Sequence, residues 1–333
     1  MKKTPMEGDS DNMPGHNQEQ TPKETGANSG QTTPNAPRNL KGIRELYDQG
    51  TNIMRYFREL EGTSLNSSEA IQISYDLQSG CTSGEVADPE YVARYDAYTS
   101  AIARTLSQYG GTSLLEAGVG EAKTLCDVMT KMPVSPPHIY GFDLAWSRIA
   151  TGLEYAARHD GFHPSLSMGD LLAMPFADNT FDVVFTAQAV NPNHGREEEA
   201  MRELYRVTRR WLLLFELDYE LGGEETKRRI EEHGYCRDLV GTAKRLGYKV
   251  VEHRLLGADV RPSIQVSVLV IEKPGADGST APSYGCPRCH QSLVSHRGNY
   301  FCADCLVVYP VLNGIPCLLP GSGILATKYL EFR

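Results

Sequence analysis

Between residues 113 and 272 the sequence alternates short apolar segments with longer amphipathic ones, and this alternation restricts the chain to few folds. Strands and helices in repeated order predict a mostly parallel β-sheet with helices on both faces. The last two strands lack an intervening helix, which predicts an antiparallel end to the sheet. The expected strands cover 113–116, 138–143, 165–169, 181–187, 211–217, 248–256 and 264–272, and the expected helices begin near 122 and cover 146–159, 197–209 and 224–246.

The segments on either side of this region have different compositions. Residues 1–38 are rich in small and polar residues and poor in large apolar ones, so we expect a disordered tail. Residues 39–110 are predicted to form a helical cap, with one helix over 40–60, broken near Gly50, and a second over 89–109. The predicted organisation continues with a catalytic domain over 111–273, a linker, and a small module over 284–320.

Charge and composition argue against several classes of protein. The chain has 333 residues, 40% of them hydrophobic, and a formal net charge of -9. An acidic chain repels phosphate backbones, so a nucleic-acid partner is not expected. No apolar run is long enough to cross a bilayer, and the N-terminus has no signal-peptide core, which predicts a cytoplasmic protein. The eight cysteines are therefore expected to be thiols or metal ligands.

A glycine turn follows the first expected strand. The strand ends in Glu116, and the chain then passes through Gly118 and Gly120 into a helix. Glycines lack Cβ atoms, so the backbone can approach a ligand closely. A dinucleotide fingerprint would need a third glycine at position 123, which is Lys123. The turn therefore fits S-adenosyl-L-methionine, which has no pyrophosphate, although by itself it could be an ordinary strand–helix turn.

Two acids follow the next two strands. Asp143 ends the second strand, where a carboxylate can accept hydrogen bonds from both ribose hydroxyls. Asp170 and Leu171 follow the third strand, where the carboxylate can accept the adenine amino group while nearby backbone reads the ring edge. Either acid alone could be a cap or turn residue. In this order after the glycine turn, they predict a cofactor site.

From about Ile71 to Glu272, the sequence resembles the class I S-adenosylmethionine-dependent methyltransferases, in particular the type grouped with ubiquinone and menaquinone biosynthesis. The resemblance implies a Rossmann-like seven-stranded sheet. It also implies a lid in which Tyr75 and Asp76 cover the cofactor, whereas a surface loop with one packed tyrosine is the alternative. The positions that match the family's cofactor residues one by one are Glu116, Gly118, Gly120, Asp143 and Asp170.

Polar residues after the fourth and fifth strands are candidates for the acceptor side, because ligands of α/β sheets bind at the carboxyl ends of strands. Methyl transfer mainly requires alignment of the acceptor, which must also lose a proton. His194 titrates near neutral pH and is the candidate general base, with a polar loop histidine as the alternative. Glu216 and Tyr219 are candidates for the same pocket, or ordinary residues at its rim.

Two C-x-x-C pairs stand near the C-terminus, separated by residues 290–301. Each pair can form a knuckle that presents two thiolates, and two knuckles complete a tetrahedral zinc site. Redox or disulfide pairs are the alternative. A module this small needs the metal for much of its folding energy. The predicted zinc ligands are Cys286, Cys289, Cys302 and Cys305, while Cys81, Cys126, Cys236 and Cys317 are expected to be packed thiols.

Residues 286–320 resemble the small zinc-ribbon proteins that activate RNA and protein methyltransferases as separate subunits. The resemblance implies a structural zinc ribbon that stabilises the catalytic part, here within one chain. The module has more apolar surface than it can bury internally. We therefore expect it to dock in cis on the catalytic domain, near the helical cap.

These observations predict a methyltransferase that uses S-adenosyl-L-methionine and carries structural zinc. The expected acceptor is a small molecule such as a sugar, a nucleotide-sugar or another metabolite. One alternative is a methyltransferase of RNA or of a translation protein. A second alternative is a non-catalytic scaffold that binds the cofactor.

Overall fold

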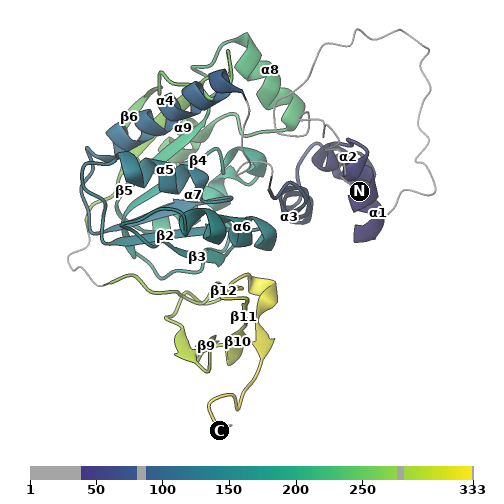
Figure 1. Ribbon diagram of the computed structural model, residues 1–333, viewed down its shortest axis with the longest axis vertical. Helices are drawn as coiled ribbons and strands as arrows, with labels where there is room; N and C mark the ends of the chain where they lie inside the picture. Colours follow the sequence, from purple (N-terminus) through teal and green to yellow (C-terminus); the bar gives the residue numbers. More distant parts are fainter. Residues whose placement is uncertain (1–38, 81–87, 276–280, 332–333) are drawn as a thin grey trace, which may run out of the picture.

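The computed structural model describes residues 39–80, 88–275 and 281–331, so the tail expected at 1–38 lies outside the described residues. A seven-stranded sheet with the order β3-β2-β1-β4-β5-β7-β6 forms its centre (Figure 1). Strands β1 to β5 are parallel, and β7 runs antiparallel to both β5 and β6. The predicted Rossmann-like, mostly parallel sheet is therefore confirmed. The strands are β1 (Ser113–Ala117), β2 (His138–Asp143), β3 (Ser165–Met168), β4 (Phe181–Ala187), β5 (Thr208–Leu217), β6 (Lys249–Leu255) and β7 (Val266–Glu272).

Helices cover both faces of this sheet. One face packs against α4 (Pro89–Leu106), α5 (Lys123–Lys131) and α6 (Trp146–Ala156), and the other against α7 (Glu197–Val207) and α9 (Leu239–Arg245). Alternate residues of the central strands point to opposite faces, as in β4, where Val183 joins the first core and Val184 the second. In the part of the chain that the structure describes, no helix is long and apolar enough to cross a membrane.

The single helix predicted over 224–246 is wrong, because the structure has two helices there. Helix α8 (Glu224–His233) ends at Gly234, which adopts a left-handed conformation with φ 62°. Helix α9 begins after Asp238, whose side chain accepts a hydrogen bond of 2.8 Å from Gly241 N. A left-handed glycine terminates a helix and an aspartate caps the start of the next one. Local capping thus divides the continuous helical pattern into two helices. Helix α8 can therefore take a direction different from that of α9 and lie beside the strand ends.

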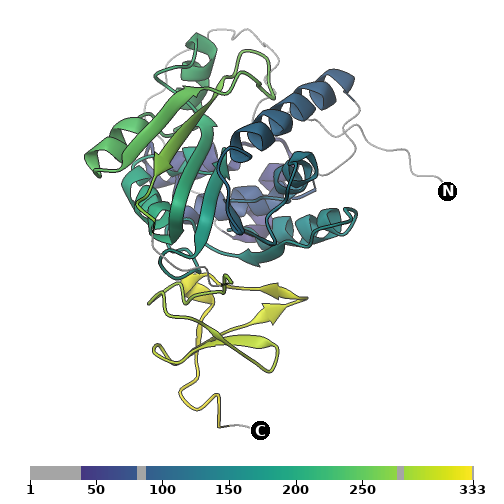
Figure 2. The ribbon, with the colours of Figure 1, turned by 90° about the vertical axis from the view of Figure 1, so that its left-hand side faces the viewer.

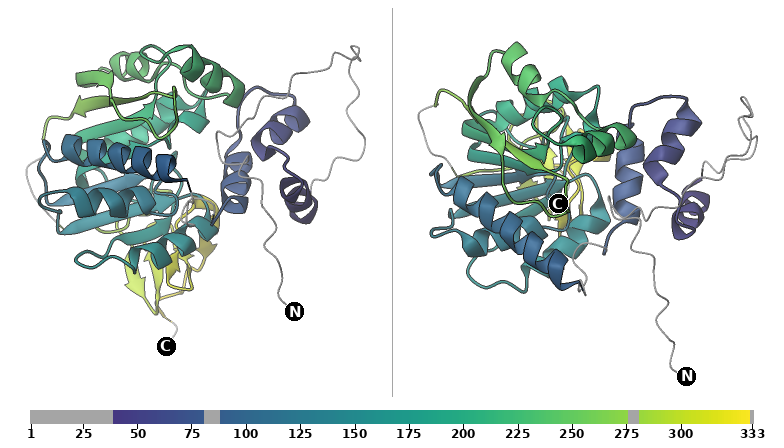
Figure 3. Two further views of the ribbon diagram at one scale, coloured as in Figure 1. Left: turned by 45° about the horizontal axis from the view of Figure 1, so that its top comes forward. Right: turned by 90° about the horizontal axis from the view of Figure 1, so that it is seen from above.

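The N-terminal region forms a separate group of helices, α1 (Leu40–Asp48), α2 (Ile53–Glu61) and α3 (Ser68–Leu77), beside the sheet (Figure 3). The predicted break lies near Gly50, whose φ is 87°. These three helices share a small core that includes Ile43, Ile53 and Phe57. Helix α4 starts after the predicted Asp88 cap, but it packs on α5 against the sheet. The helical cap therefore consists of α1 to α3 rather than all of 39–110.

Helix α3 crosses the carboxyl end of β2. Gln72 Nε2 donates a hydrogen bond of 3.2 Å to the Leu144 carbonyl. The Asp76 carboxylate accepts hydrogen bonds of 2.9 and 3.0 Å from the backbone N and the Oγ of Ser147, at the start of α6. A carboxylate at a helix N-terminus is favourable because it faces unpaired backbone N–H groups. These contacts hold α3 over the end of the sheet where ligands bind in α/β folds.

The C-terminal module contains a four-stranded sheet in the order β13-β10-β9-β8 and a short hairpin of β11 and β12. The sheet extends past residue 320, the predicted boundary, because β13 pairs with β10. Tyr329 also belongs to the module, since its hydroxyl donates a hydrogen bond of 3.1 Å to the His296 carbonyl. The strands are β8 (Val294–His296), β9 (Asn299–Cys302), β10 (Val307–Tyr309), β11 (Val311–Leu312), β12 (Ile315–Pro316) and β13 (Ile324–Leu325).

This module lies against the β3 edge of the central sheet (Figure 2). Leu318 N donates a hydrogen bond of 3.3 Å to the Met168 carbonyl, and Gly285 N donates one of 2.8 Å to the Pro175 carbonyl. The Tyr284 ring stacks on Phe176 with ring centroids 5.7 Å apart. The contacts are thus at the β3 edge and not near the helical cap, where we expected them. An edge strand with unpaired backbone groups needs such a cover.

Candidate active site and metal centre

The glycine turn after β1 has a left-handed backbone, and at Gly118 it leaves no room for a side chain. Gly118 and Gly120 have φ values of 76° and 55°, in the left-handed region. A Cβ atom at Gly118 would lie 2.3 Å from the Cβ of Ala189. The backbone N atoms of Gly118 and Val119 both donate to the Phe142 carbonyl, at 3.0 and 2.8 Å. The turn is therefore held tightly between β1, β2 and the segment after β4.

Asp143, at the end of β2, lies beside this turn. Its Oδ2 accepts a hydrogen bond of 3.0 Å from Gly120 N, and its Oδ1 accepts one of 2.9 Å from Ala145 N. Burial raises the pKa of Asp143, and the nearby Arg148 guanidinium opposes this effect. The structure thus brings the predicted ribose-binding acid next to the predicted glycine turn.

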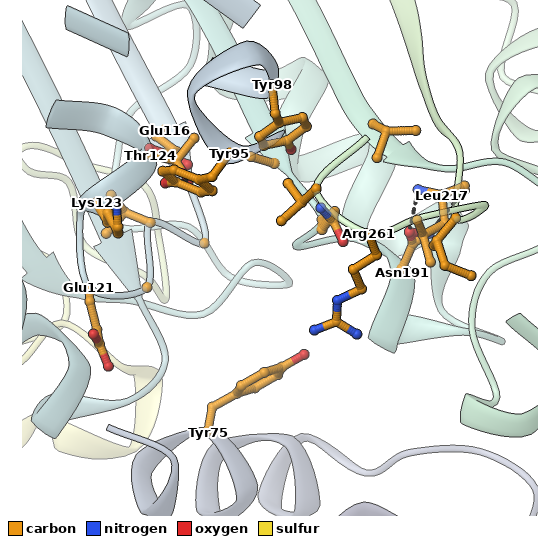
Figure 4. Close-up of a pocket in the computed structure, with 18 of the residues that line it drawn as sticks. Tyr75, Tyr95, Tyr98, Glu116, Glu121, Lys123, Thr124, Asn191, Leu217 and Arg261 are labelled. Atoms are coloured by element: carbon orange, nitrogen blue, oxygen red, sulfur yellow. Dashed lines mark hydrogen bonds between the residues drawn. The ribbon is translucent and has the colours of Figure 1, made fainter. Parts of the chain in front are cut away.

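A cavity opens at the carboxyl ends of the strands, next to the glycine turn (Figure 4). Four of the residues predicted to bind the cofactor line it, namely Glu116, Gly118, Gly120 and Tyr75. Asp143, Asp170 and Leu171 are not among the lining residues. Asp170 Oδ1 accepts a hydrogen bond of 2.9 Å from Leu172 N, and burial raises the pKa of its carboxyl group.

Glu116 is the most unusual group in this cavity. Its side chain is buried, with 1% exposure, and its Oε2 has no hydrogen-bond partner among the described residues. Burial raises the pKa of Glu116 well above its ordinary value, and the nearby Asp143 carboxylate raises it further. A cation bound beside this oxygen would therefore compensate a buried acid that the described residues leave unpaired.

The predicted Tyr75–Asp76 pair separates in the structure. Tyr75 projects from α3 into the cavity (Figure 4). The Arg148 guanidinium lies over the Tyr75 ring at 4.6 Å, and Arg148 Nε donates a hydrogen bond of 3.1 Å to the Tyr75 carbonyl. Asp76 instead caps α6 through Ser147. Of this pair, only Tyr75 therefore faces the cavity. Asp76 fixes the position of α3, the helix that carries both residues.

His194 does not line the cavity, so the structure does not support its prediction as the general base. Its Nδ1 lies 2.6 Å from Glu197 Oε1 at the start of α7. Gly195, with φ 83°, turns the chain into that helix immediately afterwards. The loop after β4 thus directs the imidazole toward α7 and away from the cavity.

Glu216 and Tyr219 also do not line this cavity. Glu216 Oε1 accepts hydrogen bonds of 3.0 and 3.1 Å from the backbone N atoms of Ala189 and Val190, and so holds the loop after β4. Burial raises the pKa of Glu216 to about 7 despite these bonds. The Tyr219 hydroxyl donates a hydrogen bond of 2.6 Å to Glu231. Both residues therefore support the structure around the site.

Sequence reasoning missed several residues of the cavity. Three tyrosines of α4 line it, and their spacing of four and three residues places them on one helix face. That spacing is visible in the sequence and indicates a shared helix face. Arg229 lies in a run of charged residues and Arg261 in a loop, so neither has a recognisable pattern. The three tyrosines are Tyr91, Tyr95 and Tyr98.

The four cysteines of the C-x-x-C pairs form one cluster in the C-terminal module. Their sulfur atoms all lie within 4.8 Å of one another. The Sγ atoms of Cys286 and Cys305 are 3.9 Å apart, and those of Cys289 and Cys302 are 3.5 Å apart. A tetrahedral zinc site with Zn–S bonds of about 2.3 Å places its sulfurs about 3.8 Å apart. The cluster therefore has the ligand set and the spacing of a four-thiolate metal site.

The other cysteines lie outside this cluster. Cys126, Cys236 and Cys317 are buried free thiols, as predicted for packed side chains. Cys81 lies outside the described residues. All cysteines that the structure describes are free, so the two C-x-x-C pairs form no disulfide.

Residues 114–210 match the family model of a methyltransferase domain, which covers the chain from β1 into β5. No curated protein matches the sequence. One similar solved structure is magnesium protoporphyrin IX methyltransferase from Synechocystis PCC 6803 with bound SAH, with 12% identity over 57% of this chain and 90% of that chain and a TM-score of 0.45. A chain of the complex between the Haloferax volcanii Trm112 methyltransferase activator and the putative methyltransferase has 15% identity over 57% of this chain and 95% of that chain, with a TM-score of 0.45. The [4+2]-cyclase SpnF has 16% identity over 53% of this chain and 81% of its own, with a TM-score of 0.43.

Proposed function

We propose that this chain is an S-adenosyl-L-methionine-dependent methyltransferase that acts on a small molecule, proceeding from the methyltransferase domain that residues 114–210 match. The observation that carries the proposal is the buried Oε2 of Glu116, which lies at the cavity without a partner among the described residues. The cofactor has an ammonium group on its methionine part. A buried carboxylate beside a glycine turn is suited to pair with that group, because the pair removes an uncompensated acid.

In this proposal the remaining predicted residues would hold the other parts of the cofactor, and Asp143, Asp170 and Leu171 would do so from outside the cavity lining. Gly118 and Gly120 would let the backbone approach it, and Asp143 would accept the ribose hydroxyls in exchange for its present bonds. Asp170 and Leu171 would hold the adenine ring, and Tyr75 would cover the site. When bound, the cofactor supplies an electrophilic methyl carbon on a sulfonium.

The protein's own task is then to orient the acceptor and to exclude water. Helices α3 and α4 contribute Tyr75 and Tyr95 to the cavity wall, so these two rings would cover part of the site. A net charge of -9 favours a small acceptor over RNA, because an acidic chain repels a phosphate backbone. The proposed acceptor class is a sugar, a nucleotide-sugar or another metabolite.

We also propose that the four clustered cysteines hold one structural Zn. Four thiolates fill a tetrahedral site, which leaves no position for water or substrate. The ribbon would stabilise the catalytic domain in cis through the contacts of Tyr284 with Phe176 and of Gly285 with Pro175. Outside the cluster, Cys126, Cys236 and Cys317 are free thiols, which persist in a reducing compartment and so support a cytoplasmic location.

The proposal is tested with labelled S-adenosylmethionine and cell extract separated into small molecules, RNA and protein. Wild-type protein is expected to transfer label to the small-molecule fraction, and Glu116→Gln is expected to lose this activity. Glu154→Gln, the same change at an exposed position on α6, is the matched control. Label in RNA or protein would replace the proposed acceptor class. Tight cofactor binding without label in any fraction would indicate a scaffold.

A further inference from the structure

Three arginines line the cavity, and none of them forms an ion pair among the described residues. Arg148 lies over the Tyr75 ring, whereas Arg229 and Arg261 have no such contact among the described residues. Arg229 comes from α8, and Arg261 comes from the turn between β6 and β7. The acids of α8 pair with other side chains, since Glu225 and Glu232 contact Arg228, and Glu231 contacts Arg237. Besides Arg148, the cavity therefore contains two guanidinium groups that form no ion pair with the described residues.

Arg261 is the less satisfied of the two. Its Nη1 is buried and has no hydrogen-bond partner among the described residues. Burial lowers the pKa of Arg261 to about 10, and the neighbouring Arg229 guanidinium contributes to this shift. Two like charges beside each other in a partly buried site are unfavourable. A bound anion would relieve both the repulsion and the missing hydrogen bond.

The backbone around Arg261 is anchored on two sides. Arg94 Nε, from α4, donates a hydrogen bond of 3.2 Å to the Val260 carbonyl. Thr226 Oγ1, from α8, donates one of 3.2 Å to the Ser263 carbonyl. The turn itself closes with a bond of 3.3 Å from Ile264 N to the Arg261 carbonyl. The guanidinium is thus carried by a turn that is fixed between α4 and α8.

The surroundings of Arg261 are aromatic and apolar. Figure 4 shows its guanidinium pointing into the cavity toward the hydroxyl end of Tyr75. Tyr91 and Tyr235 line the same cavity, and Ile264 contributes apolar surface. Such walls suit a flat, unsaturated ligand body, since aromatic rings pack well against one another. Arginine in turn suits carboxylates and phosphates, which it can bind with two parallel hydrogen bonds.

We propose that Arg229 and Arg261 bind an anionic group of the methyl acceptor, a carboxylate or a phosphate, whose unsaturated body packs among Tyr75, Tyr91 and Tyr235. This inference rests on the proposed methyltransferase function. The cofactor's own carboxylate is not the assigned occupant. It is attached to the same carbon as the ammonium, so it stays near Glu116, on the opposite side of the cavity from Arg261 (Figure 4).

The test uses three small probes on the full chain, both free and saturated with S-adenosylhomocysteine. Benzoate is the aromatic carboxylate, benzamide is its neutral counterpart of the same shape, and inorganic phosphate is the second anion. Calorimetry on the wild-type protein is expected to show at least one anion binding about tenfold more tightly than benzamide. The better of the two anions identifies the acidic group of the acceptor.

Single variants then assign the site. Arg229→Met and Arg261→Met are each expected to reduce the anion preference by about tenfold and to leave the affinity for S-adenosylmethionine unchanged. Arg228→Met is the matched control on the same helix, because Arg228 is exposed and pairs only at the surface. Arg261→Lys, which keeps the charge, provides a second variant in case Arg261→Met fails to fold.

Equal affinity of the wild-type protein for benzamide and both anions would overturn the proposal, and so would a preference that survives in Arg261→Met. Loss of cofactor affinity in Arg261→Met, with the anion preference intact, would assign the arginine to the cofactor and also overturn it. Failure of the proposed function gives a different result. In that case the wild-type protein would bind no S-adenosylmethionine, or would bind it without transferring label to a small molecule. The anion preference of the cofactor-free protein would still report on the two arginines.

Discussion

The Glu116 carboxylate and the Arg261 guanidinium line the same cavity from opposite sides, and each has a buried polar atom without a hydrogen-bond partner among the described residues. Burial raises the pKa of Glu116 and lowers the pKa of Arg261, so each group is less stable as an ion here than in water. A cation at one side and an anion at the other would compensate both. The proposed cofactor and an anionic acceptor supply these two charges.

The metal site leads to the first prediction. Protein purified without added metal is expected to contain about one Zn per chain, as a four-thiolate site requires. Cys302→Ser should lose the metal and unfold the C-terminal module, because metal binding supplies much of the folding free energy of such modules. Cys317→Ser is the control, since Cys317 is buried in the same module outside the cluster. A folded module without metal in elemental analysis would disprove this account.

The contact between Tyr284 and the catalytic domain leads to the second. Tyr284→Ala removes a ring that stacks on Phe176 and should lower the free energy of unfolding by about 3 kcal/mol. Deleting residues 274–333 should lower the melting temperature further and reduce solubility, because the β3 edge becomes exposed. Calorimetric melting measures the effects of the substitution and of the deletion. Tyr329→Ala is the control, because it removes a ring that packs on Phe301 within the module. An unchanged melting temperature after deletion would make the ribbon an independent module.

Strand positions could be predicted from the sequence because the segments around Leu115, Phe142 and Val184 are buried on both faces. Such segments are continuous apolar runs, which differ clearly from amphipathic helices. The break between α8 and α9 was missed because the capping roles of Gly234 and Asp238 depend on local geometry within a continuous helical pattern. Periodicity alone does not show where such a pattern is interrupted.

Residues of the site could be predicted from the sequence only where they lie close together along the chain or match a family pattern. Glu116, at the end of β1, is followed directly by the turn with Gly118 and Gly120, and Tyr75 could be placed through a family resemblance. Arg229 and Arg261 enter the cavity from separate elements, so only the packing of α8 against the turn at 261–264 brings them together. The position of His194 also depends on the folded structure, because the loop that carries it turns toward Glu197. No pattern in the sequence gives the direction of that loop.

The third prediction concerns pH. Burial raises the pKa of Glu216 from 4.5 to about 7, so the folded protein holds this proton more tightly than the unfolded chain does. Its contribution to stability is therefore full below about pH 4.5 and declines as the pH rises through 7, by about 3 kcal/mol in total. Glu216→Gln should lack this decline. Urea unfolding at pH 5 and pH 8 measures the free energy of unfolding of the wild-type protein and of Glu216→Gln. An equal change between the two pH values in both proteins would show that Glu216 is not the source of the pH dependence.

The account depends most on Glu116, and calorimetric titration with S-adenosylmethionine tests it most directly. Wild-type protein is expected to bind one cofactor per chain, with an affinity that falls as the pH is lowered through the raised pKa of Glu116, because the ammonium pairs with the ionised carboxylate. Glu116→Gln should bind about tenfold more weakly and without this pH dependence, while Glu154→Gln should match the wild type. Absence of binding by the wild-type protein, or an unchanged affinity in Glu116→Gln, would contradict the account.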